Sequence, residues 1–376
     1  MTQAVRQGVL YDKVLGCLLG GAIGDAFGIR LEMMHYRDIE AQYGHVIHFD
    51  ALPPRQPSTQ PPLEQFQPFG GNFETEPGFH PLGRWSRETG VYTDDTRYQL
   101  LACQAILRKG GPITGADLAA EWFTYRLSAE GVAEAGPTWR WAGPERTYAR
   151  ILASLERLVQ MSLAQRPCPP GWDAPIGLIH AGDLPAAAAA GSPFAVAIAA
   201  AMVPGATIDD VISTTITYAP ATGENGGAFA GRMRRLVEIA ANCPDVYALR
   251  EPFYREFLVT FPPWDAVFAL EMVPCALALS LIACGDPEQA IIGAANLGRD
   301  CDTTASMAGS LTGALHGASA LPPMWAERVL RLNPEPDLAQ VAEDFCHVLV
   351  TRALEQQRLA GVVLSQAESG ERAPDR

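Results

Sequence analysis

The sequence has few cysteines, and none of them form a recognisable metal-binding arrangement. Its eight cysteines are scattered, and no two make a Cys-x2-Cys pair, so the spacing typical of structural zinc sites is absent. Most of them stand in apolar stretches, where a cysteine is typically a small buried hydrophobic residue. The N-terminus is polar and lacks the apolar core of a signal peptide, so we expect a cytoplasmic protein.

Basic residues are also scarce. The chain carries 42 acidic residues against 28 lysines and arginines, which gives a formal net charge of −14. Proteins that bind the phosphate backbone of nucleic acids depend on lysine and arginine, so this balance disfavours that class of partner. A nucleotide ligand remains compatible with the charge, because a bound metal ion can reverse the local field.

No apolar segment favours a membrane span. Residues 184–208 carry no charge and are long enough to cross a bilayer, but they are rich in alanine and contain Pro193 and Pro204. Residues 266–284 are interrupted by Glu271. We therefore interpret both segments as helices buried among other helices and expect no membrane partner.

No segment alternates apolar and polar residues as a half-buried strand does, and no repeat of fixed period occurs. Apolar residues at helical spacing recur instead, which predicts an all-α fold. The clearest helices are predicted over 11–28, 94–108, 145–163, 265–284, 287–297, 322–332 and 337–360. Shorter signals predict a helix from Thr114 or Asp117 to about 128, and an alanine-rich helix capped by Asp183. We expect one domain over 1–365 and a disordered tail over 366–376.

Small residues form a ridge on the first predicted helix and a second ridge near residue 310. The first ridge consists of Gly16, Gly20, Gly24 and Gly28. The second consists of Ala305, Gly309, Gly313 and Gly317. Glycine inside a helix costs roughly 1 kcal/mol relative to alanine, so a ridge of glycines implies that another backbone approaches closely. We hypothesise that the two ridges pack against each other at the centre of the fold.

Residues 44–90 are dominated by proline, glycine, glutamine and aromatic residues, without a helical or strand period. This composition predicts a long irregular loop. Long loops in compact domains are often lids or binding segments. An irregular surface excursion is the alternative interpretation.

Two short acidic runs stand about two hundred residues apart, each directly before an apolar helical segment. They are Thr93-Asp94-Asp95-Thr96 and Asp300-Cys301-Asp302-Thr303. Helix N-capping is the simpler interpretation, because serine, threonine and aspartate are common caps. However, one cap needs one side chain, whereas each run offers at least three oxygen-bearing residues. If the runs meet in space, their carboxylates and hydroxyls can hold two divalent ions such as Mg²⁺ or Mn²⁺.

These runs, taken with the early segment Gly20–Gly28, resemble the ADP-ribosylglycohydrolase family. The family includes dinitrogenase-reductase-activating glycohydrolases and ADP-ribosyl-acceptor hydrolases. The motifs occur in the family's order, and the resemblance spans about residues 10–320. It implies a compact orthogonal bundle of helices around a central two-metal site.

The resemblance also implies roles for individual residues. The implied metal ligands are Thr93, Asp94, Asp95, Asp300, Asp302 and Thr303. A ribosyl bond breaks through an oxocarbenium-like transition state, and a water attacks the anomeric carbon. Asp302 or Glu32 would take the proton from that water. Glu32 stands at the family's offset after the Gly-Asp pair, although it could be an ordinary surface acid. Asp25 would orient other groups or lie in the loop that ends its helix.

Three further residues are candidate contacts for the substrate. Gly177 lies in a Pro-Ile-Gly-Leu segment that resembles a substrate-facing loop of bacterial members. His180 could contact the ligand or make a structural hydrogen bond. Tyr218 stands where many members have histidine, and it could stack on a base or ribose. The following segment, 223–227, is predicted to be a flexible loop.

The resemblance implies a metal-dependent hydrolase that removes ADP-ribose from a modified acceptor, with arginine the first expectation. One alternative is hydrolysis of a small ADP-ribose derivative or nucleoside, because Tyr218 departs from the family pattern. The other is a relative without catalysis that binds ADP-ribose or neutralises a toxin.

Overall fold

The computed structural model describes residues 6, 8–32, 34–52, 88–113, 117–118, 120–121, 184–218, 224–257 and 269–368. Every regular element in these ranges is helical. The one β feature among them is an isolated bridge between His35 and Gly298. The all-α prediction is therefore confirmed.

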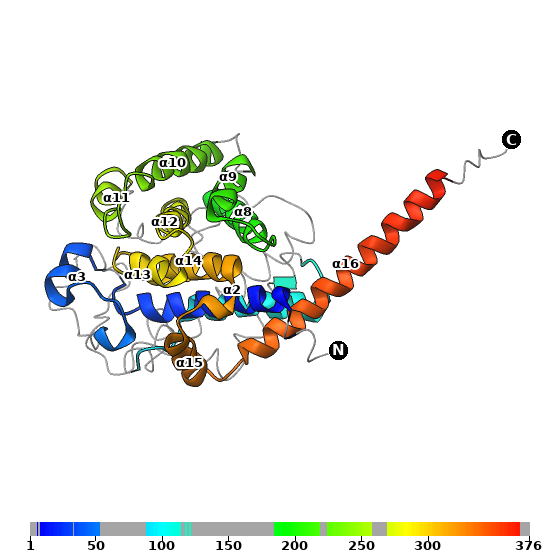
Figure 1. The fold of residues 1–376 in the computed structure, drawn as a ribbon, viewed down its shortest axis with the longest axis horizontal. Helices are drawn as coiled ribbons and strands as arrows, with labels where there is room; N and C mark the ends of the chain where they lie inside the picture. Colours follow the sequence, from blue (N-terminus) through cyan, green and yellow to red (C-terminus); the bar gives the residue numbers. More distant parts are fainter. Residues whose placement is uncertain are drawn as a thin grey trace, which may run out of the picture.

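Figure 1 shows how the helices follow one another along the chain. They are α2 (Val9–Gly28), α3 (Tyr36–Tyr43), α4 (Asp94–Lys109), α8 (Leu184–Ala201), α9 (Ile208–Tyr218), α10 (Glu224–Ala240), α11 (Arg250–Glu256), α12 (Ala269–Ile282), α13 (Pro287–Ala295), α14 (Cys301–His316), α15 (Pro323–Leu332) and α16 (Leu338–Glu368). Two 3-10 turns, Phe49–Ala51 and Ala318–Ala320, complete the described elements.

Helices α2 and α14 lie side by side through the middle of the molecule (Figure 1). Helix α12 packs on α14, and α8, α9 and α10 gather beyond it. Helix α15 lies on the opposite side, against α2. Ala22, Ile23 and Ala305, which lie in this central pair, are fully buried.

The two small-residue ridges pack against each other, as hypothesised from the sequence. A methyl group added to Gly16, Gly20 or Gly24 would overlap the backbone carbonyl of Gly313, Gly309 or Ala305, respectively. As the residue number rises from Gly16 to Gly24 along α2, the number of the contacted residue in α14 falls by the same amount. The two helices therefore run antiparallel. A methyl group at Gly28 would lie 2.5 Å from the Cα atom of Asp302. The packing therefore places the second acidic run beside the C-terminal end of α2.

Several predicted helix boundaries are confirmed to within a few residues. Helix α4 ends at Gly110, whose φ of +70° gives the left-handed cap that favours glycine. Asp286 caps α13 by accepting a hydrogen bond from the Gln289 amide at 2.8 Å. Helix α16 continues to Glu368, beyond the predicted end at 360 and into the predicted tail, because no proline or glycine interrupts residues 362–368.

Four helices were not predicted, namely α3, α9, α10 and α11. The prediction of a loop over 223–227 is wrong for Glu224 onwards, where α10 begins. Asn225, Gly226 and Gly227 are weak helix formers, but tertiary packing of the later turns, where Ala230 and Met233 are buried, overrides propensity. The predicted helix over 145–163, most of the helix after Thr114, and the capping residue Asp183 lie outside the described residues, as does most of the 44–90 loop.

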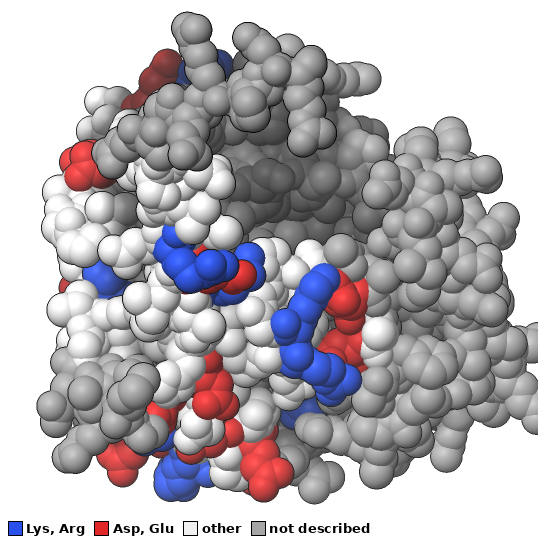
Figure 2. All heavy atoms as spheres, turned by 90° about the vertical axis from the view of Figure 1, so that its right-hand side faces the viewer, with Lys and Arg blue, Asp and Glu red and all other residues white. Residues whose placement is uncertain are grey.

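Two surface properties of the described residues bear on possible partners. None of the described helices combines the length and hydrophobicity needed to cross a bilayer. On the face toward which α16 projects, described basic and acidic side chains lie next to one another (Figure 2). On this face the described basic side chains therefore form no continuous patch.

We expect Gly309→Ala to lower the free energy of unfolding by about 3 kcal/mol or more, because the added methyl group would force α2 and α14 apart. Leucine at Gly20 or Gly313 should prevent folding. Gly231→Ala is the matched control, since Gly231 lies in α10 with nothing within 4 Å of an added methyl group; it should stabilise by roughly 0.5–1 kcal/mol. Urea unfolding measures both variants, and equal stability for Gly309→Ala and Gly231→Ala would contradict the packing argument.

Candidate metal centre and active site

The buried carboxylate of Asp25 holds the start of α4 in place. It accepts hydrogen bonds from the Thr93 amide at 2.9 Å, the Thr96 amide at 3.1 Å and the Thr96 hydroxyl at 2.5 Å. Burial raises the pKa of Asp25 to about 6, although the bonds from Thr96 and Thr93 oppose that shift. Asp25 therefore positions the first acidic run, which is one of the two roles that its place in the sequence suggested.

Within the first run, Thr93 acts as the N-cap of α4. Its hydroxyl accepts a hydrogen bond from the Asp95 amide at 3.3 Å, and the residue is buried. The helix-cap interpretation therefore holds for this threonine. The backbone of Asp94 begins α4, while its side chain lies outside the described part of the chain.

The second run follows a tight turn in which two residues adopt left-handed backbone conformations. Gly298 has a φ of +77° and Arg299 a φ of +60°. The Arg299 amide donates to the Met34 carbonyl at 2.8 Å, and the Tyr254 hydroxyl donates to the Leu297 carbonyl at 2.9 Å. A left-handed conformation is strained for arginine, so these contacts are needed to hold it.

A buried ion pair further fixes this turn. The Arg299 guanidinium donates to both carboxylate oxygens of Glu271, at 2.5 and 3.2 Å. Glu271 is only 3% exposed, and bidentate pairs of this kind are among the more directional interactions in proteins. The turn and the ion pair together fix the position from which Asp300 enters the site.

Asp300 occupies the N-cap position of α14 but makes no side-chain capping bond. Only its backbone carbonyl is used in the helix, where it accepts from the Thr304 amide and hydroxyl. The helix-cap interpretation of this side chain therefore fails. Its carboxylate instead joins the carboxylates of Glu32 and Asp302.

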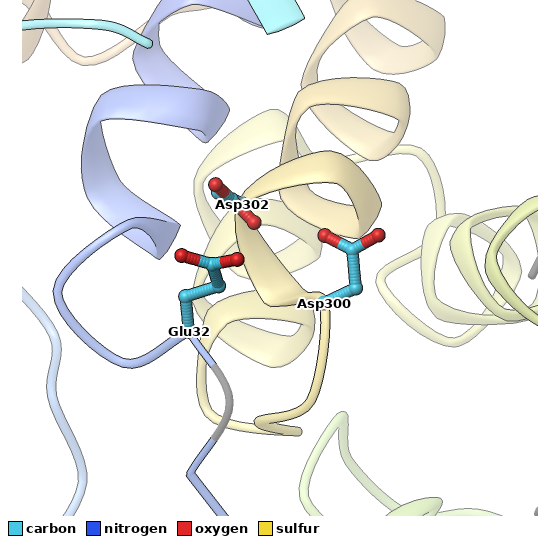
Figure 3. Close-up of side chains that lie close together, drawn as sticks. All are labelled: Glu32, Asp300 and Asp302. Carbon is cyan, nitrogen blue, oxygen red and sulfur yellow. The ribbon is translucent and has the colours of Figure 1, made fainter. Parts of the chain in front are cut away.

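These three carboxylates form the acidic cluster: Glu32, Asp300 and Asp302. Each offers one oxygen atom, and these three atoms lie within 4.8 Å of one another. Figure 3 shows them pointing toward one another from the loop after α2, the turn before α14 and the first turn of α14. Asp300 and Asp302 are buried, and Glu32 is half-buried. The thiol of Cys301, which lies between the two aspartates in the sequence, donates to the Gly28 carbonyl at 3.3 Å.

The first acidic run reaches this cluster through Asp95. The Thr303 hydroxyl donates to Asp95 at 2.7 Å. Burial raises the pKa of Asp302 well above its usual range, and the like charges of Glu32, Asp300 and Asp95 raise it further. The two runs therefore meet, as expected from the sequence, and Glu32 is part of the same site.

The cluster has the chemistry of a site for a hard divalent cation. Carboxylate oxygens are the ligands that Mg²⁺ and Mn²⁺ prefer. Several buried carboxylates this close repel one another, and a cation would remove that repulsion. Glu32, Asp300 and Asp302 could hold such an ion, with Asp95 and Thr303 beside them.

The structure places the remaining expected residues as follows. Tyr218 ends α9 with 70% of its surface exposed. Gly177 and His180 lie outside the described residues. Three residues that shape the site were not identified from the sequence, namely Glu271, Arg299 and Tyr254. The position of Arg299 directly before Asp300 could have marked it as part of the site. Nothing in the sequence marked Glu271 or Tyr254, because both lie far from the acidic runs along the chain.

The family model for ADP-ribosylglycohydrolases matches residues 6–357, which is nearly the whole chain. The chain belongs to the ADP-ribosylglycohydrolase family. Membership supports hydrolase activity on ADP-ribose linkages. The family is metal-dependent, and the acidic cluster offers a place for an ion.

Individual relatives differ in extent and similarity. The uncharacterized protein YegU of Escherichia coli strain K12 is 25% identical over 334 residues, covering 83% of this chain and 90% of YegU. The ADP-ribosylarginine hydrolase Tri1 of Pseudomonas putida strain GB-1 is 55% identical over 51 residues, 14% of each chain. A solved ADP-ribosylglycohydrolase-related protein complex matches 90% of this chain and 98% of its own, at 20% identity and a TM-score of 0.41.

We expect Mg²⁺ or Mn²⁺ to raise the melting temperature of the protein and EDTA to reverse the effect. At an ion concentration of about 100 times the Kd, the gain in stability is about 2.7 kcal/mol. Asp302→Asn should lose this gain while being at least as stable as the parent without metal, because it removes one repelling charge.

Asp209→Asn provides the control for this experiment, since Asp209 is an exposed acid in the first turn of α9. It should keep the full metal-dependent gain. Differential scanning calorimetry with and without ions measures all three proteins. An undiminished gain in Asp302→Asn would show that the ion binds elsewhere.

Proposed function

We propose that this protein is a metal-dependent hydrolase that removes ADP-ribose from a modified arginine side chain. The observation that carries the proposal is the convergence of Glu32, Asp300 and Asp302 with Asp95 in one buried acidic cluster. Family membership supplies the ADP-ribose part of the proposal. The short, closely similar match to an ADP-ribosylarginine hydrolase supports arginine as the acceptor.

We propose that the site holds two ions, Mg²⁺ or Mn²⁺. The proposed ligands are Thr93, Asp94, Asp95, Asp300, Asp302 and Thr303. The contact between Thr303 and Asp95 supports this arrangement because it joins the two runs. Bound ions would neutralise the carboxylates, bind ribose hydroxyls and make a water molecule more acidic.

The chemical step is hydrolysis of the bond between the ribose and the acceptor nitrogen. The oxygen of a water molecule forms a bond to the anomeric carbon as the bond to nitrogen breaks, and the electron pair of that bond stays on the nitrogen of the released guanidine. A carboxylate takes a proton of the water, and the guanidine takes up a proton in turn. Glu32 is the better placed of the two candidate bases, because it is half-buried, whereas Asp302 is only 5% exposed and is surrounded by acids. Asp302 would then serve chiefly as an ion ligand.

Gly177, His180 and Tyr218 are the proposed contacts for the substrate. The exposed ring of Tyr218 is available to stack on a base or ribose. Its difference from the histidine of many family members makes a small ADP-ribose derivative or nucleoside the second candidate substrate. Cytoplasmic location also remains part of the proposal.

The test is release of ADP-ribose from arginine-, serine- and DNA-base-linked substrates with Mg²⁺, with Mn²⁺ and with EDTA. We expect metal-dependent release from the arginine linkage. Glu32→Gln should lower kcat by about 10²–10⁴-fold. At least part of the metal-dependent rise in melting temperature should persist, because glutamine keeps one oxygen ligand and Asp300 and Asp302 are unchanged. Asp302→Asn should lose both activity and that rise.

Asp209→Asn is again the control and should retain full activity. Release only from a small ADP-ribose derivative would move the assignment to the second candidate. Ion binding without hydrolysis of any of these substrates would overturn the enzymatic proposal and favour a binding protein. Full activity in Asp302→Asn would refute the role of the cluster.

A further inference from the structure

Helix α16 begins on the body of the molecule and then leaves it. Leu338, Ala342 and Cys346 are buried against the core. Further along the helix, Arg352 lies beside Gly111, just after the end of α4. Every residue from 353 to 366 is exposed, and Figure 1 shows this part of the helix projecting away from the other helices.

The face of α16 that is buried at its start continues as an uncharged face where the helix is exposed. An α-helix turns about 100° per residue, so the residues that continue the buried stripe can be found by their angle around the helix axis. They fall within one arc of about 100° on the helix surface. This arc, the α16 seam, consists of Leu349, Ala353, Gln356, Gln357, Ala360 and Leu364. Leu349 and Leu364 are 38% and 62% exposed, and Val350 and Val363 flank the seam at 43% and 64%.

The seam carries no charge. Glu355 and Arg358 lie on the opposite side of the helix, and Arg352 lies at its flank, where it pairs with Glu355 at 2.8 Å. Projecting helices that need no partner are usually polar all round. An uncharged stripe with exposed leucine and valine side chains at both ends indicates a surface that another helix covers.

The seam is symmetric about its own midpoint, between Gln356 and Gln357. Reading outward in both directions, the same residue types recur: glutamine, alanine and leucine in the seam, and valine beside it. The matched pairs are Gln356 with Gln357, Ala353 with Ala360, Leu349 with Leu364 and Val350 with Val363. In an antiparallel helix pair with a two-fold axis, each residue faces the mirror position on the other copy. A second copy of this chain therefore presents the complement that this seam requires.

We propose that two copies of the protein associate through the exposed half of α16, paired antiparallel about a two-fold axis between Gln356 and Gln357. Leucines face leucines at the two ends, the alanines allow close approach of the helices, and the glutamines can hydrogen-bond across the axis. The overlap of 349–364 is about 24 Å long at 1.5 Å per residue. Two helices in contact over this length make a small interface, so we expect the dimer to dissociate at about micromolar concentrations.

Sedimentation equilibrium of the full chain tests the proposal over a range of protein concentrations. We expect a monomer–dimer equilibrium for the parent and a monomer for Ala360→Glu, which places a charge in the seam at an exposed position. Leu359→Glu is the matched control, because it adds the same charge one residue away and outside the seam; it should dimerise like the parent. A parent that stays monomeric up to about 100 µM, well above this range, would overturn the proposal, as would loss of the dimer in Leu359→Glu alone.

Cysteine cross-linking tests the antiparallel arrangement. Gln357→Cys lies next to the axis, so mild oxidation should join two copies well beyond the level seen for the parent. Leu364→Cys would lie about 22 Å from its equivalent at 1.5 Å per residue, so it should not cross-link above that level. Equal cross-linking of both variants would indicate a parallel pair and refute the two-fold arrangement.

Discussion

The close contact between the backbones of α2 and α14 sets the geometry of this protein. With no side chain on Gly16, Gly20 or Gly24, the facing turns of α14 come to rest directly on α2. Such packing admits one register, because a slip of one residue would bring Cβ atoms where only hydrogens fit. The register in turn places Asp302 beside Gly28, and Glu32 follows after one short turn. The acidic cluster is therefore a consequence of how two helices pack.

Several carboxylates held together without a counter-ion repel one another. The hydrogen bonds and the ion pair around the acidic cluster hold the segments that carry these carboxylates in place. Asp25 ties the start of α4 to α2 through Thr93 and Thr96. Arg299 is held in a left-handed conformation by Met34 and Glu271. Strained backbone and crowded like charges are typical of functional sites, where the rest of the fold supplies the stability that the site lacks.

Much of this arrangement could be predicted from the sequence. The four-residue spacing of glycines predicted the packing of α2 on α14, and the two acidic runs predicted where the site would form. Both signals are local and periodic. The bidentate pair between Arg299 and Glu271 could not be predicted, because its partners are 28 residues apart and nothing in the sequence links them. The α10 helix was missed because tertiary packing outweighs its weak first turn. Asp300 looked like an ordinary cap, and only the structure shows that its carboxylate is not used for one.

The contact between Cys301 and the Gly28 carbonyl joins residues separated by 273 positions. Such a long separation means that the central helix pair closes one of the longest loops in the chain, and forming contacts of this kind is slow. During synthesis α2 leaves the ribosome long before α14 exists, with its glycine face uncovered. The acidic cluster therefore assembles late, only after most of the domain has already been made.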